Sequence, residues 1–293
     1  MREKSFLLER VLEVFRKNGY SLFFYGKCFD LIAKKNDKWI VKVLYNLDTF
    51  TEKDAKNIKA ISYFVFSYPF VVAEVSNNRK LEDEVLYFRF GVYAGTVSTL
   101  SKLIEGKKAE IFSVKGKHLV RIDCEKMKRL RIEKNLSLGA LSKKVSLSKK
   151  SLYEIENNLV IPTRETVIKL EKILGDSIRE KVEINFPKKE VIQPSTKTEK
   201  KIFYVFKKIG VEGSFLNVSF NFIGRKEKSL MVVSKEIEAS EEKIVFDISK
   251  FLDSISFSVV ERKDSLLPVV PLRDLNEISS FEELKERVLR GYQ

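Results

Sequence analysis

Residues 136–156 read LSLGALSKKVSLSKKSLYEIE, and they predict two short helices joined by a tight turn. Ser137 is placed to cap the first helix, because a serine hydroxyl accepts a hydrogen bond from a free amide of the first turn. Ser148 is placed in the same way before the second helix, whose expected buried residues are Leu152 and Ile155. Two short helices with a turn of three or four residues between them form a helix-turn-helix.

Around this stretch, residues 130–175 resemble the Cro/lambda-repressor type of helix-turn-helix, also called the XRE family. The likeness runs from Leu130-Arg131 through the quoted stretch to Pro162 and to the last helix, VIKLEKILG (167–175). It implies that the second helix of the pair lies in the major groove of double-stranded DNA.

The resemblance also implies, position by position, which residues contact DNA. Lys149, Lys150 and Glu154 would face base edges, since lysine donates to guanine and glutamate accepts from cytosine. Ser148 and Asn157 would meet phosphates, and Tyr153 would contact either the backbone or a thymine methyl group. A solvated lysine face is the alternative to this interpretation. The full predicted set is Ser148, Lys149, Lys150, Ser151, Tyr153, Glu154 and Asn157.

Three further residues of this segment are interpreted differently from the seven above. Leu138 stands where the family usually has a glutamine, which weakens one expected phosphate contact. Asn158 stands where a glycine is common, and asparagine tolerates the left-handed conformation. Glu156 is expected to anchor its helix to neighbouring helices, because another acid on the DNA side would face phosphate unfavourably.

The charge of the chain agrees with a polyanionic partner. Lys plus Arg outnumber Asp plus Glu by 55 to 41, which gives a net charge of +14. The excess lies in residues 1–123, with 22 basic against 15 acidic, and in 124–183, with 14 against 9. Residues 184–293 have 19 against 17, so they are nearly balanced. DNA contact is therefore expected from the helix-turn-helix, with help from the segment before it.

A repeat surrounds the helical middle. VFRKNGY (14–20) matches VFKKIGV (205–211), and FDLIAKK (29–35) matches FNFIGRK (220–226) at the same offset of 191. Farther along, GVYAGTVSTL (91–100) resembles LLPVVPLRDL (266–275), with less chain between in the second copy. Three matches in the same order indicate a duplicated domain.

Each copy predicts the same order of elements: an amphipathic helix ending at a glycine, two strands, a helix, an apolar strand, a short strand and a closing helix. The apolar stripe of the first helix contains Leu8, Val11, Leu12 and Phe15, and its counterpart contains Ile202, Val205 and Phe206. The expected later helices cover about 51–64 and 238–252, and the closing ones 97–105 and 280–290.

CFDLIAKKNDKWIVK (28–42) raises the question of a nuclease site. A PD-(D/E)XK nuclease needs two acids and a lysine around Mg²⁺, and here Asp30 and Lys42 are suitably placed. The second acid would stand at Ile40, which cannot bind a metal. Rescue by Glu13 or Glu74 is the open alternative, and a structural pairing of Asp30 with Lys42 is preferred to a catalytic role.

The second copy is expected to be farther from a nuclease. Asn221 replaces the aspartate, while Met231 and Val233 fall at the positions of Ile40 and Lys42 in sequence. Both copies therefore resemble inactive relatives of the nuclease fold. We predict an α/β (α+β) protein in which two degenerate restriction-endonuclease-like domains flank a helical DNA-binding domain.

The predicted boundaries follow from these patterns. They are a nuclease-like domain at 1–108, a hairpin connector at 109–123, the helix-turn-helix domain at 124–183, a linker at 184–200 and the second nuclease-like domain at 201–293. The hairpin is expected to turn at Lys115-Gly116. Its Lys115, Lys117, His118 and Arg121 form either a wing against DNA or a solvated connector.

The sequence contains few residues for other kinds of functional site. The two cysteines, Cys28 and Cys124, lack C-x-x-C spacing, and His118 is the one histidine, so zinc sites and Cys-His catalysis are not expected. Each thiol is expected to be buried and inert. No apolar run reaches about 18 residues and the N-terminal stretch carries acids, which predicts neither a membrane helix nor a signal peptide.

The whole arrangement resembles a group of archaeal helix-turn-helix transcriptional regulators with nuclease-like flanks. Matching stretches are FDLIAKKNDKWIVKVLYNLD (29–48) and the one quoted first. The resemblance implies regulation of transcription. Together with the residues above, it leads us to expect a non-enzymatic, sequence-specific regulator without catalytic residues, metal or cofactor, acting on double-stranded DNA as a homodimer. It would work in the cytoplasm, at the nucleoid. A Mg²⁺-dependent nuclease targeted by the helix-turn-helix and an architectural chromatin protein are the rivals. The operator and any small-molecule effector are not indicated.

Overall fold

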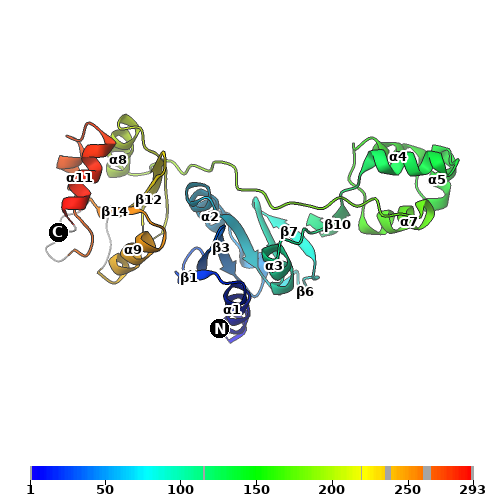
Figure 1. The fold of residues 1–293 in the computed structure, drawn as a ribbon, viewed down its shortest axis with the longest axis horizontal. Coiled ribbons are helices and arrows are strands. Elements are labelled where there is room, and N and C mark those ends of the chain that lie inside the picture. Colours follow the sequence, from blue (N-terminus) through cyan, green and yellow to red (C-terminus); the bar gives the residue numbers. More distant parts are fainter. Residues whose placement is uncertain (1, 115, 219, 235–238, 260–264, 292–293) are drawn as a thin grey trace. The chain divides into compact units, whose positions relative to one another are not determined.

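The computed structural model describes residues 2–114, 116–218, 220–234, 239–259 and 265–291 of the chain (Figure 1). They fall into two compact units. Unit 1 consists of Met1–Asn18, Leu44–Thr49 and Val71–Ile184, and unit 2 consists of Gly19–Val43, Phe50–Phe70 and Asn185–Gln293.

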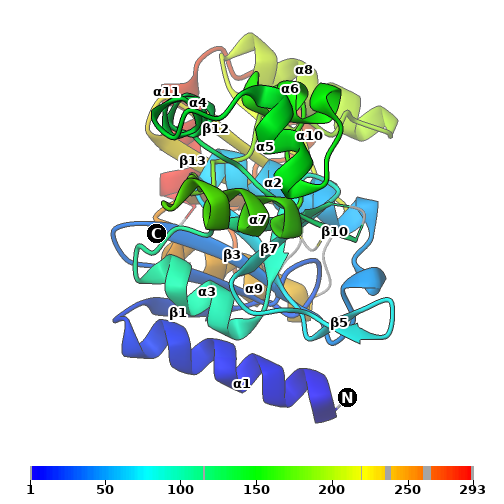
Figure 2. The same ribbon diagram turned by 90° about the vertical axis from the view of Figure 1, so that its right-hand side faces the viewer.

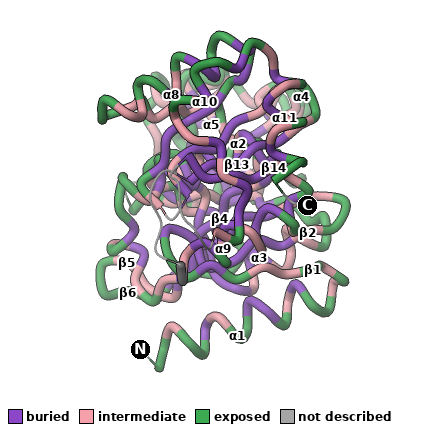
Figure 3. Tube along the Cα trace, turned by 90° about the vertical axis from the view of Figure 1, so that its left-hand side faces the viewer, coloured by how far each residue is buried: buried purple, intermediate pink, exposed green. Residues whose placement is uncertain are grey.

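Unit 1 begins with helix α1 (Arg2–Lys17). Its buried stripe is Leu7, Val11, Leu12 and Phe15, so Leu7 takes the place predicted for Leu8, which is only half-buried. Spacings of four residues bring this stripe to one side of the helix. Figure 3 shows buried and exposed stretches alternating along α1. The helix packs on α3 (Val97–Ile104), whose N-cap hydroxyl on Thr96 accepts from the amide of Thr99.

The strands of unit 1 follow the order β4-β8-β7-β9-β10. β7 pairs antiparallel with β8 and parallel with β9, and β9 pairs antiparallel with β10. Strand β4 contributes its last residues here and its first residues to unit 2. A short 3-10 helix, η1, and a two-stranded ribbon of β5 and β6 complete this part. The bounds are η1 Leu47–Thr49, β4 Tyr68–Val72, β5 Val75–Ser76, β6 Arg79–Lys80, β7 Val85–Arg89, β8 Val92–Gly95, β9 Ile111–Val114 and β10 Lys117–Val120.

The rest of unit 1 is helical, as predicted. It contains α4 (Cys124–Glu133), α5 (Leu138–Val145), α6 (Lys149–Glu156) and α7 (Arg164–Leu174), the green helices of Figure 2. Their apolar sides form one core that also includes Ile111 and Val120 of the β9–β10 hairpin. The hairpin is therefore a packed connector between the sheet and the helices. Lys115, at its predicted turn, lies outside the described residues.

Unit 2 contains the early strands of the first copy, helix α2 and the whole second copy. Its first sheet has the order β1-β2-β3-β4, and its second has the order β11-β12-β13-β14. In the second sheet β11, β12 and β13 are antiparallel, and β14 is parallel to β13. First-copy bounds are β1 Ser21–Phe24, β2 Leu31–Lys34, β3 Lys38–Val43 and α2 Glu52–Val65. Second-copy bounds are α8 Lys197–Lys208, β11 Glu212–Phe215, β12 Phe222–Lys226, β13 Ser229–Ser234, α9 Ala239–Phe251, β14 Ile255–Ser258, α10 Leu272–Leu275 and α11 Phe281–Arg290.

The repeat is visible in the strand bounds. Adding 191 to the bounds of β1 (21–24) gives β11 (212–215), and adding it to β3 (38–43) gives β13 (229–234). The initial helices lead into Gly19 and Gly210, with φ of 73° and 77°, a left-handed conformation that favours glycine. The predicted stripe of Ile202, Val205 and Phe206 is buried in the second core.

The helix that corresponds to α3 in the second copy is not the one that was predicted. The predicted partner of α3 is the helix at 280–290, which exists as α11. However, α10 packs on α8 as α3 packs on α1, and α10 also lies on the sequence match of 91–100 to 266–275. The counterpart of α3 is therefore α10, and α11 is an additional helix that packs on β14.

The predicted fold class, α/β with a helical segment in the middle, is confirmed. Within the described ranges, no helix has both the length and the apolar character needed to cross a membrane.

Candidate nucleic-acid interface

The helix pair α5 and α6 is defined by local hydrogen bonds. The hydroxyl of Ser137 accepts from the amide of Ala140 at 3.1 Å, and that of Ser148 accepts from the amide of Ser151 at 2.9 Å. Both predicted caps are thus confirmed. Between the helices Ser146 adopts a left-handed conformation with φ of 58°, and the amide of Leu147 donates to the carbonyl of Ser142 at 2.9 Å. These bonds turn the chain sharply into α6.

Packing determines which side of α6 faces outward. Leu152 and Ile155 are buried, as predicted, in a core with Leu141 and Val145 of α5. Positions 152 and 155 are three apart and lie on one side of the helix, so intervening side chains point away from the core. The second helix therefore presents a polar side to solvent.

That polar side carries most of the predicted DNA-binding residues. Lys149 and Lys150 are exposed, and the Lys150 side chain is 84% exposed. Tyr153 is also exposed, at 53% for the whole residue. Ser148 and Asn157 are exposed at the two ends of the helix, while Ser151 and Glu154 are half-buried. The seven residues lie along one helix and its caps, which is the arrangement that readout by a single helix requires.

Some of these side chains already have partners. The Ser148 and Ser151 hydroxyls are 2.9 Å apart, and the Asn157 amide nitrogen donates to the carbonyl of Tyr153 at 2.8 Å. Lys150 Nζ lies 3.9 Å from Glu154 Oε1, one helical turn away. A pair at this distance on a surface contributes little to stability, so the lysine can exchange it for a base edge or a phosphate.

Glu156 is an anchor, as predicted. Its two carboxylate oxygens accept from Nε and Nη2 of Arg131 in α4, each at 2.7 Å. The Arg131 and Glu156 side chains are 13% and 7% exposed, and Nη1 of Arg131 donates to the carbonyl of Leu136 at 2.9 Å. The hydrogen bonds that Arg131 donates to the Glu156 carboxylate raise the pKa of Arg131 above its ordinary value. This bidentate pair fixes the angle between α4 and α6.

The departures from the family pattern have local explanations. Asn158 adopts φ of 57°, the left-handed conformation expected there. Leu138 is half-buried at the start of α5 and packs against the helical core. Lys143 and Lys144, which are not in the predicted set, are exposed in the last turn of α5 beside the turn into α6. Their adjacency in the sequence was the available signal.

The hairpin residues considered for a wing lie near protein groups. His118 Nδ1 is 3.5 Å from Glu82 Oε1, and the guanidinium of Arg121 lies over the ring of Phe112 at 5.8 Å. The amide of Val120 donates to the carbonyl of Pro162 at 3.0 Å. These contacts connect the hairpin to α7 and to its own sheet, and they favour the connector interpretation.

The nuclease-like positions of the first copy lie on two paired strands. Ile32 of β2 is opposite Ile40 of β3, so extending the ladder by two residues places Asp30 opposite Lys42. Because side chains alternate between faces, Asp30, Ile40 and Lys42 share one face of the strands. The face carries the aspartate and the lysine of the nuclease pattern, but Ile40 is fully buried and supplies no oxygen ligand.

Asp30 and Lys42 are both buried and both bonded to the main chain. Oδ2 of Asp30 accepts from the amide of Val43 at 2.7 Å, and Nζ of Lys42 donates to the carbonyl of Lys27. These bonds hold the segment before β2 against β3. Glu74, considered as a rescuing acid, accepts from Arg10 at 2.7 Å, and Glu13 lies 3.9 Å from Lys17. No cluster of three or more metal-binding side chains occurs among the described residues.

The register between β12 and β13 in the second copy differs from the one that the sequence match predicts. Phe222 is opposite Val233, so one further step places Asn221 opposite Ser234. Ser234, not Val233, therefore occupies the place that Lys42 has opposite Asp30. The cause is the β12–β13 turn, in which Lys226 pairs with Ser229, whereas Lys34 pairs with Lys38 in the first copy. A slip by one residue moves every side chain to the other face.

Comparisons with known proteins agree with both parts of this description. Residues 4–109 match the PD-(D/E)XK superfamily domain, and residues 127–180 match a helix-turn-helix domain. No solved structure shows a significant match.

Relatives cover nearly the whole chain. A "Putative HTH-type transcriptional regulatory protein" of Thermococcus gammatolerans is 27% identical, over 98% of this chain and 96% of its own. Proteins of the same description from Pyrococcus horikoshii and Picrophilus torridus are each 28% identical over 98% of this chain, covering 98% and 97% of their own. The predicted resemblance to archaeal regulators of this type is confirmed.

Proposed function

We propose that this chain, which carries a PD-(D/E)XK superfamily domain followed by a helix-turn-helix domain, is a sequence-specific transcriptional regulator of double-stranded DNA. In this proposal the nuclease-like part spans 1–108, the connector 109–123, the DNA-binding part 124–183, the linker 184–200 and the second nuclease-like part 201–293. Its place of action is the nucleoid in the cytoplasm.

The observation that carries the proposal is the outward side of α6. Lys149, Lys150 and Tyr153 are exposed there, while Leu152 and Ile155 hold the helix to its core. A helix with this division can enter the major groove without unfolding its own domain. Lysine amines then donate to guanine, Glu154 accepts from cytosine, and the caps Ser148 and Asn157 meet phosphates.

The regulator acts as a homodimer in this proposal, with two recognition helices roughly 34 to 36 Å apart. Support comes from an apolar run after α6, in which Leu159, Val160 and Ile161 are all exposed. These residues line a hollow of about 400 Å³ together with Cys124 and Pro162. A projecting leucine and a hollow on one surface are the self-complementary features that a two-fold interface uses.

The nuclease-like parts are proposed to be non-enzymatic and to bind no metal or cofactor. Ile40 supplies no ligand where a second acid is needed, and Lys42 is already bonded to a carbonyl. The rival, a Mg²⁺-dependent nuclease, is supported by the match of residues 4–109 and by Asp30 and Lys42 on one face.

Selection of bound fragments from the host genome, followed by titration, tests the proposal. A regulator should prefer its selected site over unrelated duplexes by about 10³ or more at fixed salt. Lys150→Ala should weaken the selected site by about 1–3 kcal/mol and relax the preference at one base position. Lys53→Ala, which removes the same charge from α2, is the matched control. Equal affinity for all duplexes would favour the architectural rival.

Two further measurements separate the remaining rivals. Supercoiled and branched DNA incubated with Mg²⁺ or Mn²⁺ should remain intact, and cleavage that Asp30→Ala abolishes would overturn the non-enzymatic proposal. Sedimentation should give a dimer that Leu159→Glu dissociates. A monomer at the concentration where operator binding saturates would contradict the dimer.

A further inference from the structure

A cavity of about 330 Å³ lies in unit 1 between α3 and the end of the helix-turn-helix part. Its walls come from Glu84, from α3, from residues 107–111, from the first residue of α7 and from Arg179. The volume is at the lower end of the range for small-molecule sites, roughly 300 to 1,000 Å³. The walls therefore belong to both the nuclease-like and the DNA-binding parts of the chain.

The lining is strongly basic. Five cationic side chains contribute to it, against two carboxylates, Glu84 and Glu110. The five are Lys102, Lys107, Lys108, Arg164 and Arg179. Leu103, Ala109 and Ile111 add an apolar portion, and Thr99 adds a hydroxyl. Guanidinium and ammonium groups around a small apolar floor match a compact organic phosphate.

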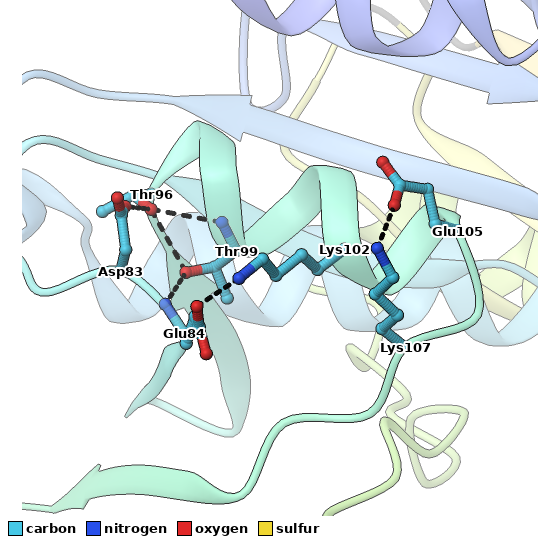
Figure 4. A network of polar contacts seen from close by, with 7 residues as sticks. All are labelled: Asp83, Glu84, Thr96, Thr99, Lys102, Glu105 and Lys107. Carbon is cyan, nitrogen blue, oxygen red and sulfur yellow. Dashed lines mark hydrogen bonds and ion pairs between the residues drawn. The ribbon is translucent and has the colours of Figure 1, made fainter.

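Hydrogen bonds make the α3 wall rigid. The Thr96 hydroxyl donates to Asp83 and accepts from the Thr99 amide, while the Thr99 hydroxyl accepts from the Glu84 amide at 3.1 Å (Figure 4). These bonds attach the start of α3 to the 83–84 segment. The wall is therefore built without any ligand, as a preformed site requires.

The cations are held by acids, several of which do not line the cavity. Figure 4 shows Lys102 reaching toward Glu84 and Lys107 toward Glu105, the latter pair at 2.8 Å. Arg164 lies 3.0 Å from Glu82, and Lys108 pairs with Glu183. Exposed pairs of this kind contribute little to stability, so an incoming phosphate can replace them.

Arg179 is the best anchored of the five. Its Nη2 lies 2.8 Å from Glu171 of α7, and its Nη1 lies 3.6 Å from Glu110. The hydrogen bonds that Arg179 donates to the Glu171 carboxylate raise the pKa of Arg179 above its ordinary value. Arg179 therefore keeps its charge and position, and connects the cavity to the last helix of the DNA-binding part.

We propose that this cavity binds a small phosphate ester, with the phosphate among Lys102, Lys107 and Arg164 and the remainder against Leu103 and Ile111. Binding there joins α3 to the start of α7, so the ligand contacts the nuclease-like and DNA-binding parts at once. The proposal does not depend on the DNA sequence that the chain recognises.

Calorimetric titration of the full-length chain with adenosine 5′-monophosphate, inorganic phosphate, citrate and adenosine tests this, at fixed pH and 150 mM salt. Saturable binding of the monophosphate, with adenosine at least tenfold weaker, is expected. Lys107→Glu and Arg164→Gln should each weaken the monophosphate at least tenfold. Lys56→Glu, a charge reversal on an exposed lysine of α2, should leave it unchanged.

Several outcomes would overturn the proposal. They are no saturable binding of either phosphate probe, citrate binding as tightly as the monophosphate, or equal affinity in Lys107→Glu and Lys56→Glu. Circular dichroism of each variant verifies folding, and Lys107 is exposed, so its replacement leaves the core intact. Loss of duplex binding in Arg164→Gln without any effect on phosphate probes would assign these cations to the DNA backbone instead.

Discussion

Lys34 and Arg225 occupy corresponding positions 191 residues apart, and each donates a hydrogen bond to the end of the other copy's helix. Nζ of Lys34 donates to the carbonyl of Phe251 in α9 at 3.1 Å, and Nε of Arg225 donates to the carbonyl of Phe64 in α2 at 3.0 Å. Phe64 and Phe251 themselves correspond, since α2 begins at Glu52 and α9 at Ala239, an offset of 187. Reciprocal contacts of this kind define an approximate two-fold relation within unit 2.

The next residues extend the same relation. Phe66 and Asp253 follow the two helices with φ of 54° and 53°, and each contacts the cation of the other copy. Asp253 forms an ion pair with Lys34, whereas the ring of Phe66 lies 4.4 Å from the Arg225 guanidinium. Cations are favourable at helix C-termini, because the last carbonyls carry partial negative charge. A second copy thus supplies, within one chain, the partner surface of the first.

Hydrogen exchange should detect this reciprocity. Arg225→Ala should speed exchange at the end of α2, near residues 62–67, and Lys34→Ala should do so at 249–254, because each loses its carbonyl partner. Lys228→Ala, in the exposed β12–β13 turn, is the control and should change neither. Equally faster exchange across all of unit 2 in each variant would contradict this prediction, because it would indicate a general loss of stability instead of the loss of a local contact.

Breaking the Arg131–Glu156 pair should destabilise the helix-turn-helix part. Glu156→Ala leaves a largely buried guanidinium without its carboxylate, which should lower the free energy of unfolding by about 3–5 kcal/mol. Arg129→Ala, in the same helix with an exposed partner 4.0 Å away, should lower it by at most about 1 kcal/mol. Urea unfolding measures both. A double variant, Arg131→Met with Glu156→Leu, should be less damaging than Glu156→Ala alone, and a larger loss would contradict this account.

Low pH should destabilise the helix-turn-helix part, because the Glu171 carboxylate becomes protonated. Burial raises the pKa of this carboxyl, but hydrogen bonds from Arg179, Ile178 and Ser177 outweigh burial and lower it overall. A carboxyl whose pKa is lowered in the folded state stabilises the fold fully above its unfolded-state pKa, about 4.3. This stabilisation is lost as the pH falls through the folded-state pKa. Wild-type unfolding free energy should therefore drop as pH falls below about 5. Glu171→Gln should flatten that drop, whereas Glu133→Gln, at an exposed site, should not.

The two thiols should differ in reactivity. Burial raises the pKa of Cys28 to about 12, although nearby Lys42 lowers it in part, and the thiol itself is buried. Burial also raises the pKa of Cys124, which is only half-buried and donates from Sγ to the carbonyl of Ile155 at 3.3 Å. At pH 8 iodoacetamide should modify Cys124 slowly and Cys28 only after unfolding, as read by mass spectrometry. Modification of native Cys28 as fast as Cys124 would refute this.

Features that arise from residues close together in the chain could be predicted from the amino-acid sequence. Ser137 and Ser148 predicted both helix starts, since capping needs only a hydroxyl three residues from a free amide. The spacing of Leu152 and Ile155 predicted the buried side of α6, and with it the outward side carrying Lys149 and Lys150. The offset of 191 predicted that both copies contain the same order of elements, because a duplicated pattern folds into the same local elements.

Contacts between residues far apart in the chain could be established only from the three-dimensional fold. The slip of β13 by one residue places Ser234 opposite Asn221, and a turn geometry that the sequence match does not resolve sets that register. Arg131 became the partner of Glu156 because α4 packs across α6, and the basic cavity exists because the fold brings α3 close to the first residue of α7. Such contacts depend on packing between elements far apart in sequence. Hydrophobic burial drives that packing but has no direction, so the close-packed shape of the fold determines which individual side chains meet.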